Sequence, residues 1–155
     1  MDAGEPGRPD WPRVGFPVRT EGTMKTTRIL VADANASFLL GAMTSLSQLP
    51  HVEIVGCNAT AAEAIAQVEA LIPDVLVLDA DTLSPAGWQS LRRLLARDER
   101  PRVVVTSEEL EGENCFLARA VGADVCLRKH EVGHLLFPML GAAPTPAEAT
   151  YRIQG

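Results

Sequence analysis

Five short apolar runs constrain the fold of this 155-residue sequence more than any other feature. They are RILVAD (28–33), VEIVG (52–56), DVLVLD (74–79), RVVVTS (102–107) and DVCLRK (124–129). Each run is rich in Val, Ile or Leu and hardly alternates polar with apolar residues. This composition is typical of strands that are buried on both faces, as in a parallel sheet.

The segments between these runs have helical periodicity. We predict helices over 37–49, 60–72, 86–97 and 111–122, and a short last helix near 131–140 that Pro138 kinks or ends. Thr60 and Glu63 have the spacing of a capping box, and Gly122 is a good C-cap. In the fourth helix we expect Phe116, Leu117 and Ala120 to point inward. Alternation of strands and helices predicts an α/β, doubly wound sheet with right-handed crossovers.

Polar groups end four of the predicted strands: Asp33, Asp79, Ser107 and Lys129. In a doubly wound sheet the functional site lies beyond the carboxyl ends of the strands. Two carboxylates there can hold a hard cation such as Mg²⁺, and one of them can attack phosphorus to give an acyl phosphate. A lysine and a hydroxyl stabilise a phosphoryl group. We therefore expect Asp79 as nucleophile, Asp33 as metal ligand, Lys129 as fixed charge and Ser107 as hydrogen-bond donor.

Residues 28–140 resemble the receiver domain of two-component response regulators. The segment ILVADAN looks like the first strand of that family with its acidic pair, and PDVLVLDADTLSPAGW looks like the strand that carries the phosphoacceptor aspartate. Gly87 fits the glycine that follows it, VVVTS ends at the switch position Ser107, and GADVCLRK ends at the family's lysine, here Lys129. The resemblance implies a (βα)5 flavodoxin-like three-layer sandwich with a five-stranded parallel sheet of order 2-1-3-4-5.

The resemblance also implies a separate role for each of these residues. A partner histidine kinase would donate phosphate to Asp79, and Mg²⁺ would bind Asp33, Asp79 and the backbone carbonyl of Asp81. Ser107 would move toward the phosphoryl group and repack the face formed by the fourth helix, the fifth strand and the fifth helix. The protein would signal by contact with other proteins, and a homodimer through a helical face is expected.

Three departures from the family pattern predict an atypical receiver. Ala34 stands where the second acid is expected, so Mg²⁺ affinity should fall. Cys126 takes the place of the aromatic switch residue of the fifth strand. Leu83 stands at the usual proline position, with Pro85 two residues later. The main alternative is therefore a phosphate-independent pseudo-receiver that serves as an interaction module.

Other interpretations of the same residues stay open. DADTL (79–83) nearly matches the DxDxT motif of haloacid-dehalogenase-like phosphatases, with the threonine one position early. One alternative interpretation is that Asp79 is a structural acid at a strand end and Asp81 a loop acid. Asp33 and Ser107 are candidates to cap the first and fourth helices, and Lys129 is a candidate solvated lysine.

Charge and composition exclude several other classes. The formal net charge is −6, unlike the basic surface of a nucleic-acid-binding protein. No apolar run reaches the ~18 residues of a membrane span, and the first residues lack the apolar region of a signal peptide. Cys57, Cys115 and Cys126 are odd in number and widely spaced, so we predict buried free thiols in a reducing cytoplasm.

The chain is expected to contain one domain. We predict a disordered leader over 1–24, the receiver domain over 25–141 and a flexible tail over 142–155, with no DNA-binding output domain. We do not expect an enzyme: the predicted activity is at most self-phosphorylation and self-dephosphorylation.

Overall fold

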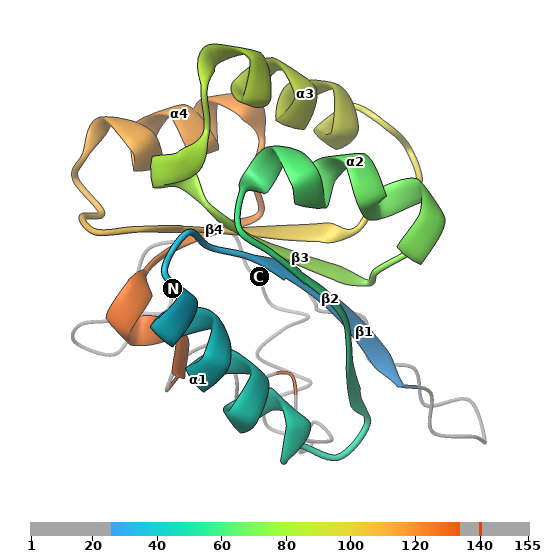
Figure 1. Cartoon of the computed structure of the whole chain (residues 1–155). Coiled ribbons are helices and arrows are strands. Elements are labelled where there is room, and N and C mark those ends of the chain that lie inside the picture. Colours follow the sequence, from blue (N-terminus) through green and yellow to red (C-terminus); the bar gives the residue numbers. More distant parts are fainter. Residues whose placement is uncertain (1–25, 134–139, 141–155) are drawn as a thin grey trace, which may run out of the picture.

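A computed structural model describes residues 26–133 and 140. The described chain forms one five-stranded parallel sheet in the order β2-β1-β3-β4-β5 (Figure 1). The strands are β1 (Thr27–Ala32), β2 (Val52–Asn58), β3 (Val75–Asp79), β4 (Arg102–Ser107) and β5 (Val125–Arg128). The predicted fold class and strand order are confirmed, and each strand lies within two residues of its predicted position.

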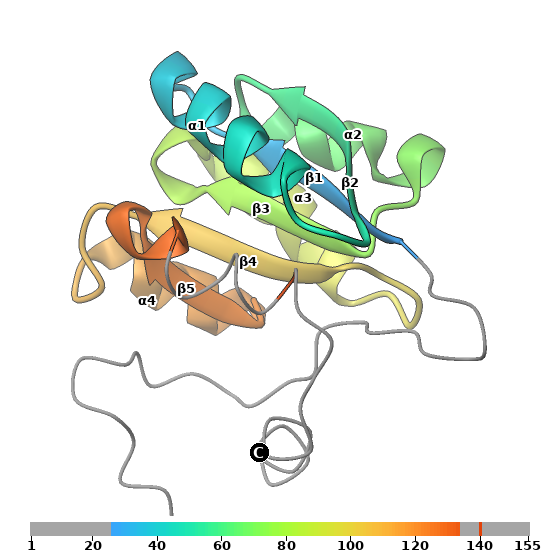
Figure 2. The same cartoon turned by 90° about the horizontal axis from the view of Figure 1, so that it is seen from below.

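Four α-helices connect the strands: α1 (Ala36–Ser47), α2 (Ala61–Leu71), α3 (Pro85–Leu95) and α4 (Glu113–Val121). Two single turns of 3₁₀ helix, η1 (Ala80–Thr82) and η2 (Lys129–Glu131), follow β3 and β5. Helices α2, α3 and α4 cover one face of the sheet and α1 lies on the other (Figure 1). Strand β5 forms the edge opposite β2, and α4 lies near that edge (Figure 2).

The sheet separates two hydrophobic clusters. Odd-numbered positions of β1 and β3, such as Ile29 and Val77, pack with Ala42 and Leu46 of α1. Even-numbered positions, such as Leu76, pack against α2, α3 and α4. All five residues of β3 are buried, because this central strand has neighbours on both sides and helices on both faces. The absence of polar alternation in the sequence follows from this burial.

The helix ends follow their local sequence signals. Thr60 and Glu63 form the predicted capping box of α2, and Gly122 ends α4 in the left-handed conformation at a φ of 99°. The side chains of Asn35 and Ser84 cap α1 and α3 by accepting the backbone N–H of Phe38 and Gly87. These caps fix the points at which the chain leaves each strand tip for the next helix.

The prediction for the inward face of α4 was wrong. The helix begins at Glu113, and its buried residues are Cys115 and Ala118. Phe116 is 71% exposed, and Ala120 also faces solvent. Cys115 and Ala118 are three positions apart and share one helix face, which turns Phe116 away from the sheet.

Some predictions fall outside the described residues. They are the leader over 1–24, the tail over 142–155 and the effect of Pro138 on a last helix. Within the part that the structure describes, no helix has the length and apolar character needed to cross a membrane.

Candidate functional site

Asp33 and Asp79 lie at the carboxyl ends of neighbouring strands. Ala32 of β1 is in register with Leu78 of β3, so the aspartate that follows each of them reaches the same edge of the sheet. Both side chains are buried, with exposed fractions of 0% for Asp33 and 1% for Asp79. The sequence prediction that these acids meet is confirmed by the geometry.

Lys129 brings a positive charge to both acids from the other side of β4. It directly follows β5, and its Nζ lies 3.2 Å from Asp79 Oδ2 and 3.4 Å from Asp33 Oδ2. Its side chain is only 19% exposed. The interpretation of Lys129 as a solvated lysine was therefore wrong.

The two acids and the lysine change one another's protonation. Burial raises the pKa of Asp79 above its ordinary value, and the neighbouring Asp33 carboxylate adds to this increase against the opposing effects of the Asp81 N–H and Lys129. Burial alone would lower the pKa of Lys129, but its hydrogen bond and attraction to Asp79, together with Asp33, raise it instead. The lysine thus stays charged, and Asp79 holds its proton more readily than an exposed aspartate does.

The turn after β3 is organised by Asp79 itself. Asp79 Oδ1 accepts the backbone N–H of Asp81 at 3.0 Å, and the Asp79 carbonyl accepts the Thr82 hydroxyl at 2.9 Å. Thr82 Oγ1 also accepts the N–H of Ala61, the first residue of α2, at 3.3 Å. These bonds fix the phosphoacceptor candidate relative to the neighbouring helix.

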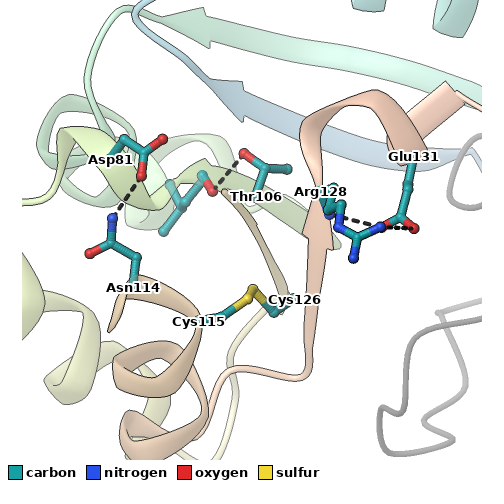
Figure 3. The surroundings of a disulfide bond; sticks show 8 residues. Asp81, Thr106, Asn114, Cys115, Cys126, Arg128 and Glu131 are labelled. Carbon is teal, nitrogen blue, oxygen red and sulfur yellow. Dashed lines mark hydrogen bonds and ion pairs between the residues drawn. A yellow bond between two sulfur atoms is a disulfide. The ribbon is translucent and has the colours of Figure 1, made fainter. Parts of the chain in front are cut away.

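Asp81 is more than an isolated loop acid. Its Oδ1 accepts a hydrogen bond of 2.6 Å from Asn114 in the first turn of α4, and Figure 3 shows the two side chains pointing toward each other. The side chain is therefore engaged with α4. The backbone carbonyl of Asp81 remains the group that the family resemblance assigns to a metal.

Ser107 ends β4, between the strands that carry Asp79 and Lys129. It is buried, and its register partner on β5 is Arg128, the residue before Lys129. The helix that follows begins only at Glu113, with Gly112 as its N-cap, so Ser107 does not cap it. Asp33 likewise does not cap α1, because Asn35 does; Asp33 Oδ1 accepts the Asn35 N–H at 2.8 Å.

Sequence reasoning missed Glu108. Its Oε2 lies 3.9 Å from Lys129 Nζ, and its side chain is 75% exposed. It therefore adds a third carboxylate at the solvent side of the lysine. Its position in the sequence could have indicated this, because Glu108 directly follows Ser107 at the end of β4.

The prediction of three free thiols was also wrong. Cys115 of α4 and Cys126 of β5 form a disulfide, which is visible in Figure 3, and only Cys57 is a free cysteine among the described residues. The two positions are 11 residues apart, but α4 packs back onto β5 and brings their Cα atoms to 6.1 Å. This distance lies in the usual range for a disulfide.

The carboxylates of Asp33 and Asp79 are suitable ligands for a hard cation, but they are few. Asp33 Oδ2 is buried and accepts no hydrogen bond from any described residue, although it lies in an ion pair 3.4 Å from Lys129 Nζ. Carboxylate oxygens are the ligands that Mg²⁺ prefers. Position 34, where a further acid is expected, holds an exposed alanine. No group of three His, Cys, Asp or Glu side chains within residues 26–133 is arranged to hold a metal.

No family model matches the sequence. Among curated proteins, it is 32% identical over 142 residues to protein-glutamate methylesterase/protein-glutamine glutaminase 2 of Cereibacter sphaeroides, covering 77% of this chain and 39% of that protein. It is 35% identical over 101 residues to the corresponding protein of Geobacillus kaustophilus, covering 64% and 29%. The chain thus spans about a third of the length of these relatives.

Solved structures agree with the topology. The signal receiver domain of the putative response regulator NarL from Mycobacterium tuberculosis superposes with a TM-score of 0.63 at 24% identity, covering 77% of this chain and 99% of that one. The response regulator domain of Thermotoga maritima CheB gives 0.57 at 22% identity, covering 84% and 96%. The chain therefore has the fold of response-regulator receiver domains. In sequence, it is similar to part of the bacterial methylesterases named above.

Proposed function

We propose that this chain is a response-regulator receiver that accepts phosphate on Asp79 from a histidine kinase and signals through contacts with other proteins. One observation carries the proposal: two buried carboxylates from adjacent strands share the ammonium group of Lys129. Burying such a cluster is costly for a structural role alone. Perturbed acids at a strand edge are typical of functional sites.

The reaction that this arrangement supports is phosphoryl transfer to a carboxylate. A carboxylate oxygen of Asp79 attacks phosphorus, the bond from phosphorus to the donor nitrogen breaks, and the donor histidine keeps the electron pair of that bond. The product is an acyl phosphate on Asp79. Lys129 offsets the negative charge of the phosphoryl oxygens, and the Ser107 hydroxyl is the proposed hydrogen-bond donor.

Asp33, Asp79 and the backbone carbonyl of Asp81 are the proposed ligands for Mg²⁺. A bound Mg²⁺ supplies charge that stabilises the transferring phosphoryl group. With Ala34 in place of an acid, we propose that Mg²⁺ binds more weakly than it does in receivers with the full acidic pair.

Intact mass after incubation with acetyl phosphate and Mg²⁺ tests the proposal. We expect a gain of about 80 Da, the mass of one phosphoryl group replacing a proton. Asp79→Asn should abolish the gain. Asp81→Asn is the matched control and should keep the gain, since it retains the backbone carbonyl proposed as a Mg²⁺ ligand and alters only the side chain that accepts the bond from Asn114.

The second candidate function is a phosphate-independent interaction module. Ala34 at the site and the disulfide at Cys126, where the family has its aromatic switch, favour this candidate. If this second candidate is correct, neither the native chain nor Asp81→Asn gains mass with acetyl phosphate and Mg²⁺. Addition of Mg²⁺ then also leaves the tryptophan fluorescence unchanged.

The phosphatase alternative predicts catalytic turnover of p-nitrophenyl phosphate. We propose that the chain has none beyond self-dephosphorylation. In the structure the DADTL segment begins at the last residue of the third strand. The Thr82 hydroxyl donates to the Asp79 carbonyl and accepts the N–H of Ala61 in α2. Turnover that Asp79→Asn abolishes would reverse this assignment.

Location and assembly belong to the same proposal. We propose a cytoplasmic protein that pairs as a homodimer and binds neither nucleic acid nor membrane by itself. The acidic net charge of −6 supports the absence of nucleic-acid contact. Analytical ultracentrifugation of the native chain, with and without acetyl phosphate, measures whether it is a monomer or a dimer.

A further inference from the structure

The first turn of α4 is the least securely capped of the four α-helices. Helices α1, α2 and α3 each have a side-chain cap, whereas α4 begins at Gly112 without one. The helix has only nine residues, and Phe116 in its second turn is 71% exposed. Short helices depend on tertiary contacts for their stability, so α4 needs other attachments.

Two adjacent residues supply these attachments. Cys115 is joined to Cys126 of β5 by the disulfide, and Asn114 donates a hydrogen bond of 2.6 Å to Asp81 Oδ1. Figure 3 shows that the two links leave the same turn of α4 in different directions, one to β5 and one to the loop after β3. The position of this turn therefore depends on both links.

The second link continues to the candidate phosphoacceptor. Asp81 accepts the Asn114 bond with its side chain, and its backbone N–H donates to Asp79 Oδ1 at 3.0 Å. A continuous series of contacts thus runs from the disulfide through α4 to the carboxylate of Asp79. Movement of the α4 turn would weaken the Asn114 bond first.

We propose that Cys115 and Cys126 are a reversible dithiol–disulfide pair whose redox state sets how firmly the first turn of α4 is held against β5 and against the loop after β3. The reductant is a dithiol. One of its thiolates attacks a protein sulfur, the protein S–S bond breaks and a mixed disulfide forms. The second thiol of the reductant resolves it, so two protein thiols and one oxidised reductant result.

Local opening gives the reductant access. Cys115 is 0% exposed and Cys126 only 5%, so neither sulfur is open to attack in the closed structure. The weak N-terminus of α4 permits the first turn to unfold locally, and such openings require less free energy than global unfolding. In the proposed cytoplasmic location a disulfide is typically redox-sensing, which agrees with a reversible pair.

The redox state is measured first by thiol alkylation and intact mass. Cys57→Ala removes the third thiol, so every adduct then comes from the pair. We expect no adducts after treatment with oxidised dithiothreitol, and two when native protein is first reduced with dithiothreitol and then alkylated under denaturing conditions. Thiols that stay free in the oxidant would refute the pair, and a bridge that resists reduction unless the chain is first denatured would refute its reversibility.

Hydrogen exchange then tests the consequence for α4. On reduction of the Cys57→Ala protein, we expect amides of residues 113–118 and of Asp81 and Thr82 to exchange about tenfold faster, as local opening becomes easier. The first turn of α2, residues 61–64, should not change. In Asn114→Ala the effect of reduction should persist in α4 and disappear at Asp81 and Thr82.

Unchanged exchange at residues 113–118 after full reduction would overturn the inference. If reduction changed the exchange at Asp81 and Thr82 equally with Asn114 and with Asn114→Ala, the coupling through Asn114 to the loop would be wrong. These measurements use no phosphate, so their outcome is independent of whether Asp79 is phosphorylated. Because the Cys57→Ala protein keeps Cys115 and Cys126 and is measured in both redox states, the test needs no substitution within the pair.

Discussion

At the scale of single residues, the candidate site contains more acidic side chains than basic ones. Asp33 and Asp79 share one lysine, and Glu108 adds a third carboxylate on the exposed side of the same ammonium group. The cluster therefore has an excess of negative charge before any ligand arrives. Such an excess favours a cation and makes the protonation of Asp79 depend on its neighbours.

Asp79→Asn should stabilise the folded protein at pH 7. Folding raises the pKa of Asp79 above 3.8, so the protonated form is favoured by folding. That contribution is fully present below pH 3.8 and is lost as the pH rises through the folded pKa, where the buried carboxylate becomes charged. The neutral amide avoids this penalty, and we expect a gain in unfolding free energy of about 1 kcal/mol.

The gain should shrink as the pH is lowered from 7 toward 4, because native Asp79 then becomes neutral too. Urea unfolding followed by circular dichroism at several pH values measures it. Asp98→Asn, at an exposed position, is the control. If the gain in unfolding free energy were constant with pH, or larger in acid, the buried charge of Asp79 would not be its cause.

Glu108→Gln should speed phosphorylation by acetyl phosphate. Glu108 competes with an incoming phosphoryl group for Lys129 at 3.9 Å and repels the anionic donor. At about 4 Å in water, such an interaction is worth at most about 1 kcal/mol, so we expect an increase of about twofold to fivefold at low salt. The increase should diminish at high salt because exposed charges are screened.

The rate of mass gain measures this effect. Glu109→Gln changes the same charge at the next exposed position and should have a smaller effect. A slower reaction in Glu108→Gln would indicate that Glu108 assists the reaction, and the two variants behaving alike would indicate a general charge effect.

At the scale of elements, local signals determined most helix boundaries but did not determine every face. The capping box at Thr60 and the stop at Gly122 were visible in sequence because each depends on residues a few positions apart. The inward face of α4 was not, because a phenylalanine was assumed to be buried. The buried face is instead the one whose Cys115 and Ala118 contact the sheet cluster.

Thr60→Ala should destabilise the protein by about 1 kcal/mol. The change removes the acceptor for the Glu63 N–H at 3.2 Å and the hydroxyl that donates to Glu63 Oε1 at 3.2 Å. Loss of an N-cap typically costs this much. Urea unfolding at pH 7 gives the difference directly.

Thr44→Ala is the matched control for Thr60→Ala. Thr44 lies within α1, and its hydroxyl donates only to the carbonyl of Leu40 one turn earlier. Alanine has the higher helix propensity, so this variant should be as stable as the native chain or slightly more stable. If both variants lost the same free energy, the capping box would not be the cause.

At the scale of the whole molecule, topology accounts for what sequence reasoning could and could not find. Parallel strands bring their carboxyl ends to one edge, so Asp33, Asp79, Ser107 and Lys129 could be grouped from their places at strand ends alone. The contact between Asn114 and Asp81 and the bridge between Cys115 and Cys126 could not. They depend on how α4 packs against two other elements, and no spacing in the sequence encodes that position.

Restoring the missing acid should increase the stabilisation of the molecule by Mg²⁺. Ala34 is exposed beside Asp33, so Ala34→Asp adds a carboxylate to a cluster that already has excess negative charge. Without metal, we expect a lower melting temperature than that of the native chain, because like charges repel. With millimolar Mg²⁺, we expect a higher one, since a ligand that binds only the folded state stabilises it.

The size of that stabilisation gives the affinity of the site. When Mg²⁺ is present at about five times its dissociation constant, the gain is about 1 kcal/mol, and the native chain should gain less at the same concentration. Ser37→Asp adds the same charge in the first turn of α1 and should respond to Mg²⁺ like the native chain. If Ala34→Asp and Ser37→Asp responded alike, Asp33 and Asp79 would not be part of a metal site, and the phosphate-independent function would become the better explanation of the fold.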